Sequence, residues 1–288
     1  MNHISYLDKY VMIPLSNDKP FTLISGPCQL QDEDHCFMMA EKLLSLTNKL
    51  DIPFVFKTSF DKANRTSVHS KRGVGLNEAL NIFHKLKQKF PEIRILTDVH
   101  ESYQVNYLDG HVDILQVPAF LCRQTDLIAS IVTKGIQVNI KKGQFLSPHS
   151  VKDIVEKCRH YGDRSLQRVA ITERGTSFGY GQLVVDMTGL QIMKQDNPNI
   201  PIIIDGTHAV QQPATNKGKS GGNRSYVANL VQAALTYKLA GVFIECHEDP
   251  DNAPSDGPNA VHLKDMPKIL ERLKHFDNYV KFHHKGEV

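Results

Sequence analysis

Short runs of apolar residues rich in β-branched side chains recur along the whole chain. They number eight and lie at residues 21–25, 53–58, 93–97, 113–117, 136–140, 168–172, 201–205 and 241–245. Most intervals between them carry apolar residues at helical spacing, as Leu76, Leu80, Phe83 and Leu86 do after the second run. The pattern predicts strands that alternate with helices.

Strands that are apolar throughout are typical of a parallel sheet covered by helices. Eight strand and helix units without a linker or a change of composition favour an α/β fold closed into a (β/α)8 TIM barrel. An open, doubly wound sheet is the less favoured alternative. We expect one catalytic domain over residues 1–288, in which residues 10–15 add a short N-terminal strand or hairpin that plugs the bottom of the barrel.

The composition is that of an ordinary globular protein, with 41% hydrophobic and 23% charged residues and a formal net charge of +3. No long basic tract or interleaved aromatic stripe is present, so we expect neither nucleic acid nor a membrane as a partner. The N-terminus lacks the apolar core of a signal peptide, which predicts a cytoplasmic protein. Five scattered cysteines predict reduced thiols rather than disulfides.

Reactive side chains stand at the end of every predicted strand. Active sites of (β/α)8 barrels lie at the carboxyl ends of the strands, so these residues are expected to meet. Each residue alone would more often be an ordinary loop residue, but their recurrence at all eight strands predicts one site. The set comprises Cys28, Lys57, Lys62, Asp98, His100, Gln116, Lys141, Arg174, His208 and Glu245.

Part of this set has the chemistry of metal ligands. The candidates are Cys28, His100, His208, Glu245 and Asp256, and sites for zinc, manganese or iron commonly mix such donors. Spacing alone does not choose among them. A cysteine such as Cys28 is more often a small buried apolar side chain, but its SGPC turn after the first strand places it towards the pocket. We interpret His247 as a loop histidine.

The other candidates are cationic, namely Lys57, Lys62, Arg65, Arg123, Lys141 and Arg174. Guanidinium groups bind phosphate and carboxylate oxygens in pairs, and lysines add mobile positive charge, so the group suits a phosphorylated substrate. Unrelated surface cations are the alternative. The string GKS at 218–220 lacks the remainder of a P-loop, and no GxGxxG or GxSxG motif supports a nicotinamide enzyme or a serine hydrolase.

Several segments resemble the 3-deoxy-D-manno-octulosonate 8-phosphate synthase family. They are FVFKTSFDKANRTSVHSKRGVG, TDVHE, QVPAFLCRQTDL, NIKKGQFLSP, ERGTSFGY, DGTHAVQ, FIECHEDP and SDGPNA, and they extend over essentially the whole chain. The resemblance implies a homotetrameric (β/α)8 transferase of lipopolysaccharide (KDO) biosynthesis. It implies that phosphoenolpyruvate, D-arabinose 5-phosphate and water give the eight-carbon keto sugar phosphate and inorganic phosphate.

Residue roles follow from the same resemblance. It implies that Lys57, Lys62, Lys141 and Arg174 hold phosphoenolpyruvate, and that Arg123 reaches the site across a subunit interface. Asn64, Arg65 and Thr66 would bind the pentose phosphate; the family more often has Ser at the last position, which keeps the hydroxyl. Gln116 joins the substrate-binding group, and the catalytic candidates are Lys62, Asn64, Asp98 and His100.

The family has a metal-dependent and a metal-free branch, and the metal-free branch has Asn at the position of Cys28. This chain also reads SDGP where the metal-free branch tends to have Cys before the Asp. The resemblance therefore implies the metal-dependent branch, with Cys28, His208, Glu245 and Asp256 around a divalent Zn, Fe, Mn, Co or Cd ion.

Two other functions compete with this interpretation. A related synthase, 3-deoxy-7-phosphoheptulonate synthase, uses erythrose 4-phosphate on a similar barrel, but its pocket segment carries Pro where this chain has KANR. The other is a barrel without catalytic activity that binds sugar phosphates as a sensor or scaffold.

Overall fold

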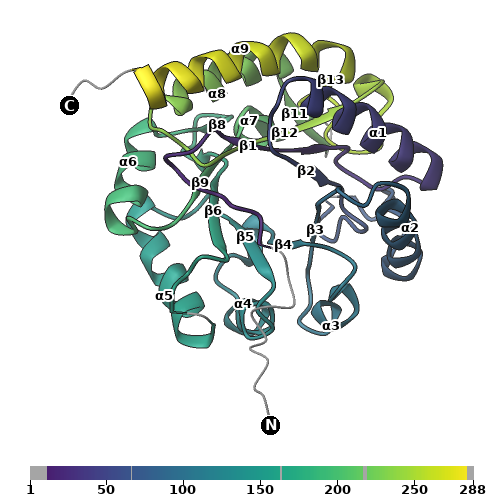
Figure 1. The fold of residues 1–288 in the computed structure, drawn as a ribbon, viewed down its shortest axis with the longest axis horizontal. Coiled ribbons are helices and arrows are strands. Elements are labelled where there is room, and N and C mark those ends of the chain that lie inside the picture. Colours follow the sequence, from purple (N-terminus) through teal and green to yellow (C-terminus); the bar gives the residue numbers. More distant parts are fainter. Residues whose placement is uncertain (1–11, 66, 163, 217–218, 284–288) are drawn as a thin grey trace.

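The computed structural model describes residues 12–65, 67–162, 164–216 and 219–283, with the backbone alone at 214–216, 219 and 220. Parallel strands form a closed ring in the order β1-β2-β3-β4-β5-β6-β9-β12 (Figure 1). The ring closes because β1 pairs with β12 from Thr22 opposite Gly241 to Gly26 opposite Glu245. The predicted barrel is confirmed, and the doubly wound alternative is wrong because an open sheet would leave both of these edges unpaired.

Each strand of the ring lies within two residues of its predicted bounds. The strands are β1 (Thr22–Gly26), β2 (Phe54–Lys57), β3 (Ile95–Asp98), β4 (Ile114–Val117), β5 (Gln137–Lys141), β6 (Val169–Glu173), β9 (Ile202–Asp205) and β12 (Gly241–His247). Apart from the half-buried Phe54, every residue in them is buried, which explains why the sequence runs are apolar throughout rather than alternating.

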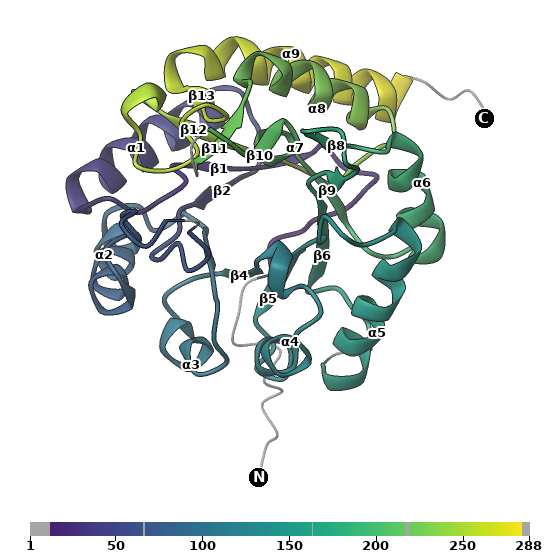
Figure 2. The same cartoon turned by 180° about the vertical axis from the view of Figure 1, so that it is seen from behind.

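Helices surround the ring on the outside (Figures 1 and 2). They bury one apolar face each: in α2, for example, Ala79, Ile82, Phe83 and Leu86 are buried at the spacing that predicted the helix. The α-helices are α1 (Glu33–Lys49), α2 (Leu76–Lys89), α3 (Gln104–Leu108), α4 (Thr125–Val132), α5 (Val151–Tyr161), α6 (Met187–Asp196), α7 (Gly206–Ala209), α8 (Val227–Leu235) and α9 (Met266–Asn278).

Short elements occupy the loops. Two antiparallel hairpins, β7 (Thr176–Ser177) with β8 (Leu183–Val184) and β10 (Gln211–Asn216) with β11 (Lys219–Gly222), follow β6 and β9, and β13 (Val261–His262) pairs with β12 outside the ring. The remaining turns are η2 (Ala119–Leu121), η3 (Pro148–Ser150), η4 (Arg224–Tyr226), η5 (Pro250–Asn252), η6 (Leu263–Asp265) and η7 (Tyr279–His283).

The segment before β1 closes the amino-terminal end of the barrel. Ile13 and Leu15 pack against an apolar cluster of ring residues that includes Ile24 and Phe243. The backbone N–H of Ile13 donates to Oε1 of Gln137 at 3.0 Å, and its carbonyl accepts from Nε2 of Gln137 at 3.1 Å. The predicted plug is therefore seen at 12–15, but these residues form no strand, because the backbone of Ile13 bonds to the Gln137 side chain and not to a strand backbone. Residues 10 and 11 lie outside the described part.

All five cysteines are free, as the sequence predicts, and all five are buried. Among the residues that the structure describes, no helix is both long enough and apolar enough to cross a membrane.

Candidate active site

A cavity of about 250 Å³ opens at the carboxyl ends of the strands. Most of the predicted site residues line it, although they come from loops and strands spread along the whole chain. Its lining includes Lys57, Lys62, Asn64, Asp98, Gln116, Lys141, Arg174, His208 and Asp256, together with Gln144, Asp205 and Gln211, which the sequence did not single out.

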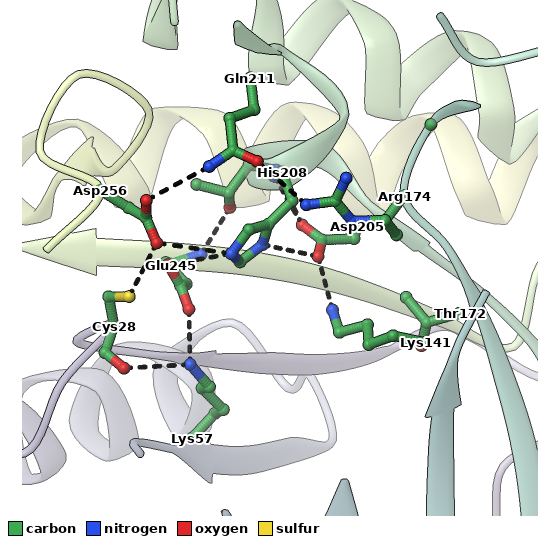
Figure 3. Close-up of polar contacts among 12 residues, drawn as sticks. Cys28, Lys57, Lys141, Thr172, Arg174, Asp205, His208, Gln211, Glu245 and Asp256 are labelled. Atoms are coloured by element: carbon green, nitrogen blue, oxygen red, sulfur yellow. Dashed lines mark hydrogen bonds and ion pairs between the residues drawn. The ribbon is translucent and has the colours of Figure 1, made fainter. Parts of the chain in front are cut away.

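Four of the predicted site residues form a group with metal-ligand chemistry (Figure 3). The donor atoms of Cys28, Glu245 and Asp256 all lie within 4.8 Å of one another, and Sγ of Cys28 is 3.0 Å from Oδ2 of Asp256. Nε2 of His208 approaches the same carboxylates, at 3.6 Å from Asp256 and 3.8 Å from Glu245. The four residues that the resemblance implied as ligands are thus brought together.

The electrostatics of this group favour a bound cation. Glu245 is fully buried, and its Oε2 atom has no hydrogen-bond partner within the described residues. Burial and the carboxylates of Asp256 and Glu245 raise the pKa of the Cys28 thiol well above its usual value. A divalent ion would satisfy the free oxygen and stabilise the thiolate, and one sulfur, one nitrogen and two carboxylates suit zinc and its neighbours.

Asp205, at the end of β9, organises the neighbouring side chains. Its Oδ2 accepts from Nδ1 of His208 at 2.8 Å and from Nζ of Lys141 at 2.5 Å, and its Oδ1 accepts from the backbone N–H groups of Thr207 and His208. The proton of the neutral imidazole is therefore held on Nδ1, which leaves Nε2 to face the ligand group. Despite its complete burial, His208 and Lys141 lower the pKa of Asp205.

Asp205 was not among the predicted site residues, because it closes the apolar run at 201–205 and was interpreted as part of the strand. Its distance of three residues from His208 was the available signal, since a carboxylate just before a one-turn helix can cap it and contact its third residue.

The cations of the cavity have unequal partners. Lys57 donates to Oε1 of Glu245 at 2.5 Å and to the carbonyl of Cys28 at 3.2 Å. Arg174 donates through Nη2 to Gln211 at 3.0 Å, while its buried Nη1 has no partner in the part of the chain that is described. Burial lowers the pKa of Arg174, and it lowers that of Lys141 to about 8 although Asp205 opposes the shift. An anion in the cavity would supply the acceptor that Arg174 lacks.

Lys62 and Asp98 form another charged pair in the cavity lining. Nζ of Lys62 donates to Oγ of Ser59 at 2.8 Å and lies 3.7 Å from Oδ2 of Asp98. Ser59 in turn donates to Oδ2 of Asp98 at 2.8 Å, and Gln116 donates to Oδ1 at 2.5 Å. Against the effect of burial, Lys62 and Lys57 lower the pKa of Asp98, so the carboxylate is a charged acceptor that holds Lys62 in place.

The contacts of Asp98 continue into the barrel wall. Oε1 of Gln116 accepts from Nδ2 of Asn139 at 3.0 Å, and Oδ1 of Asn139 accepts from the hydroxyl of Thr172 at 2.6 Å. Every donor in this row points towards Asp98, so β6, β5 and β4 together stabilise its negative charge. Asn139 and Thr172 are fully buried within strands, where the sequence offered no signal for them.

Three further candidates, His100, Arg65 and Arg123, are not part of the cavity lining. His100 packs edge-on against Phe60, and its backbone N–H donates to Gln104. Arg65 donates to Oε1 of Gln29 and to the carbonyl of Pro254, and Arg123 is exposed. Thr66 lies outside the described residues. These positions therefore stay predictions from resemblance.

The chain is similar to known proteins over nearly its whole length. The sequence model of the DAHP synthetase I family matches residues 7–281. The 2-dehydro-3-deoxyphosphooctonate aldolase of Rickettsia typhi is 48% identical over 269 residues, which cover 93% of this chain and 96% of that protein. The enzyme of the same name from Chelativorans sp. is 52% identical over 266 residues, 92% of this chain and 94% of its own length.

A closed (β/α)8 barrel that gathers lysines, an arginine and a ligand group in one cavity defines a barrel enzyme for small anionic substrates. The family match and the identities above show that the chain belongs to the DAHP synthetase I family and, within it, to the 2-dehydro-3-deoxyphosphooctonate aldolases. These enzymes are also called 3-deoxy-D-manno-octulosonate 8-phosphate synthases. The predicted resemblance is confirmed.

Proposed function

We propose that this chain condenses phosphoenolpyruvate with D-arabinose 5-phosphate and water. The products are 3-deoxy-D-manno-octulosonate 8-phosphate, a precursor for lipopolysaccharide, and inorganic phosphate. The observation that carries this proposal is the placement of Lys57, Lys62, Lys141 and Arg174 around the same cavity as Asp256 and His208, in a chain about half identical to enzymes with this name.

Phosphoenolpyruvate would lie among the buried cations. Nη1 of Arg174 is buried and has no partner among the described residues, and Lys141 lines the same cavity, so both can bind the phosphate or carboxylate oxygens. The pentose phosphate would lie further out, towards Asn64, Arg65 and Thr66. Arg123 would complete the site from a second subunit of a homotetramer, in keeping with its exposure in one chain. We place this single-domain enzyme in the cytoplasm.

The reaction joins C3 of the enol to the aldehyde carbon while water adds to C2, and phosphate then leaves C2 by C–O cleavage. Negative charge grows on the aldehyde oxygen and on the leaving phosphate. Lys62 would donate a proton to one of these oxygens, and Asp98 would hold its ammonium group in position through direct attraction and through Ser59. Holding both anions in contact contributes a large part of the rate.

Cys28, His208, Glu245 and Asp256 would hold a divalent ion of the Zn, Fe, Mn, Co or Cd group. When bound, such an ion supplies Lewis-acid polarisation of an oxygen or a more acidic water. Asp205 and Lys57 support these ligands by orienting His208 and by neutralising Glu245.

Phosphate release from phosphoenolpyruvate tests the proposal, with arabinose 5-phosphate and erythrose 4-phosphate supplied in parallel. We expect turnover with the pentose phosphate alone, lost after chelation and restored by added metal. Turnover with erythrose 4-phosphate would favour the heptulosonate synthase, and binding without turnover would favour a sensor. Activity that survives verified metal removal would contradict the metal requirement and leave the condensation itself standing.

A further inference from the structure

A second group of metal-binding side chains lies outside the cavity. His35 belongs to the first turn of α1, His247 ends β12, and Glu248 follows it. The two histidine side chains are 10% and 8% exposed and that of Glu248 is 38% exposed, so the group is anchored in the protein but open to solvent on one side. We propose that these three residues bind a second transition-metal ion of the zinc class.

The positions of the donor atoms support an ion here. Oε2 of Glu248 lies 2.9 Å from Nε2 of His35 and 3.2 Å from Nδ1 of His247, and ligand atoms of the three residues all lie within 4.8 Å of one another. Two ligands of a tetrahedral zinc ion at normal bond lengths are about 3.3 Å apart. The carboxylate is therefore already at ligand separation from both rings, and small rotations of the rings would bring the third distance into range.

Hydrogen bonds around His247 leave Nδ1, the nitrogen that would bind the ion, without a proton. The backbone N–H of Asp249 donates to Nδ1 of His247 at 3.0 Å, so this atom carries a lone pair. The proton of the neutral ring then lies on Nε2, which is 2.6 Å from Nε2 of Gln31. A flip of that amide, which exchanges its nitrogen and oxygen, places an acceptor oxygen opposite this N–H. Histidines that bind metals typically donate their other N–H in this way, which fixes the ring for coordination.

The chemistry of the donors limits which ion can bind. Two imidazoles and one carboxylate suit zinc, cobalt, nickel or copper, while magnesium and calcium prefer oxygen ligands alone. The site has no thiolate, and an ion would displace the Asp249 N–H from His247. We therefore expect it to fill after the Cys28 group, with lower affinity.

An ion at this position would join two segments that matter to the cavity. Gln31 follows Cys28 on the connection from β1 to α1, and His35 lies in the first turn of α1. His247 is two residues beyond Glu245 on β12. A bound ion would hold α1 against the end of β12 and so fix the distance between those two residues. None of the three ligands lines the cavity, so the proposal does not rest on the proposed reaction.

Cobalt titration of the chelated full-length protein tests the second site. A thiolate–cobalt charge-transfer band reports the Cys28 group, whereas bound cobalt without that band reports the outer site. We expect the wild type to bind two ions per chain, His35→Ala to bind one with the band, and Cys28→Ala to bind one without it. Gln31→Leu should lower the affinity for the second ion by about 10-fold to 100-fold.

His149→Ala is the matched control. Nδ1 of His149 lies 2.8 Å from one carboxylate, that of Asp196, and this ion pair contains no second histidine. This variant should bind two ions, as the wild type does. Should Cys28→Ala fail to fold, wild type and His35→Ala are each loaded with one zinc ion, and one equivalent of cobalt is then added to each. Binding of this cobalt to wild type but not to His35→Ala gives the same comparison. The proposal is overturned if wild type and His35→Ala bind equal numbers of ions. Phosphate release, measured separately, reports on the proposed reaction.

Discussion

At the scale of single residues, buried charges in this protein act mainly on other side chains. Asp205 is the clearest case, because one carboxylate caps α7, orients His208 and pairs with Lys141 while being fully buried. Burying a charge is unfavourable unless every oxygen has partners, and here both oxygens do. The arrangement is therefore sensitive to removal of the charge.

We expect Asp205→Asn to bind the metal of the Cys28 group about 10-fold to 100-fold more weakly, because the amide no longer fixes the His208 tautomer. Competition with a coloured chelator measures this. The matched control is Asp186→Asn, which changes an exposed residue that caps α6 and should leave affinity unchanged, since Asn caps helices as well as Asp. Equal affinities in both variants would contradict the orienting role.

Lys141 gives a pH prediction at the same scale. Burial lowers its pKa to about 8, so the free enzyme loses this cation as the pH rises through 8. We expect kcat/KM for phosphoenolpyruvate to fall above that pH, since this parameter reports groups of the free enzyme. Lys141→Arg, which stays charged, should be slower but show no such fall. A fall at the same pH in the variant would assign it to another group.

At the scale of elements, the eight strands carry both the stability and the site. Gln116, Asn139 and Thr172 lie on β4, β5 and β6, and their side chains connect the wall of the barrel to Asp98 on β3. A substitution at Thr172 therefore affects the hydrogen bonds of Asn139 and Gln116 as well, because each amide is held in place by the next hydrogen bond.

We expect Thr172→Val to lower stability by about 1–3 kcal/mol, because Oδ1 of buried Asn139 would lose its donor. Thr97→Val is the matched control: Thr97 is also fully buried on β3, but its hydroxyl has no partner in the described structure. That change should be neutral or stabilising. Thermal unfolding compares the two variants, and equal midpoints would mean that the Thr172 bond contributes nothing.

The strands were predictable from the sequence because buried parallel strands are apolar at every position. The two hairpins were not. β7 and β8 have two residues each, and the longer β10 and β11 read QQPATN and KSGG, which show no alternation of apolar and polar residues. For the site, strand ends located Cys28, Lys57 and Glu245, but polar residues inside a strand, such as Asn139, look like ordinary strand positions. Their role depends on which strands become neighbours, and only the closed ring determines that.

At the scale of the whole molecule, the two ends of the barrel differ in composition and in function. The amino-terminal end is closed by Ile13 and its apolar contacts, whereas the carboxyl-terminal end holds the closely spaced charges. Without metal, the cavity keeps these charges only because they pair with one another. Stability of the whole chain should therefore depend on pH differently with and without metal.

His208 determines the direction of that dependence. Although burial lowers it, Asp205 and Glu245 raise the pKa of His208 to about 9 from 6.5. In metal-free protein, the protonated ring therefore adds stability that is complete below pH 6.5 and is lost as pH rises through 9. The shift corresponds to roughly 3 kcal/mol. With metal bound, the ring is already neutral, and metal affinity increases as competing protons are lost.

We thus expect the thermal midpoint of chelated wild type to fall between pH 6.5 and 9 relative to that of chelated His208→Gln. The lowered pKa of Lys141 acts in the opposite direction above pH 8, because the unfolded chain there binds more protons. Both proteins contain Lys141, so subtracting the midpoint of the variant from that of the wild type removes the Lys141 contribution. Metal-loaded wild type should show no such fall. Parallel pH curves for the two chelated proteins would mean that the protonated His208 contributes no stability.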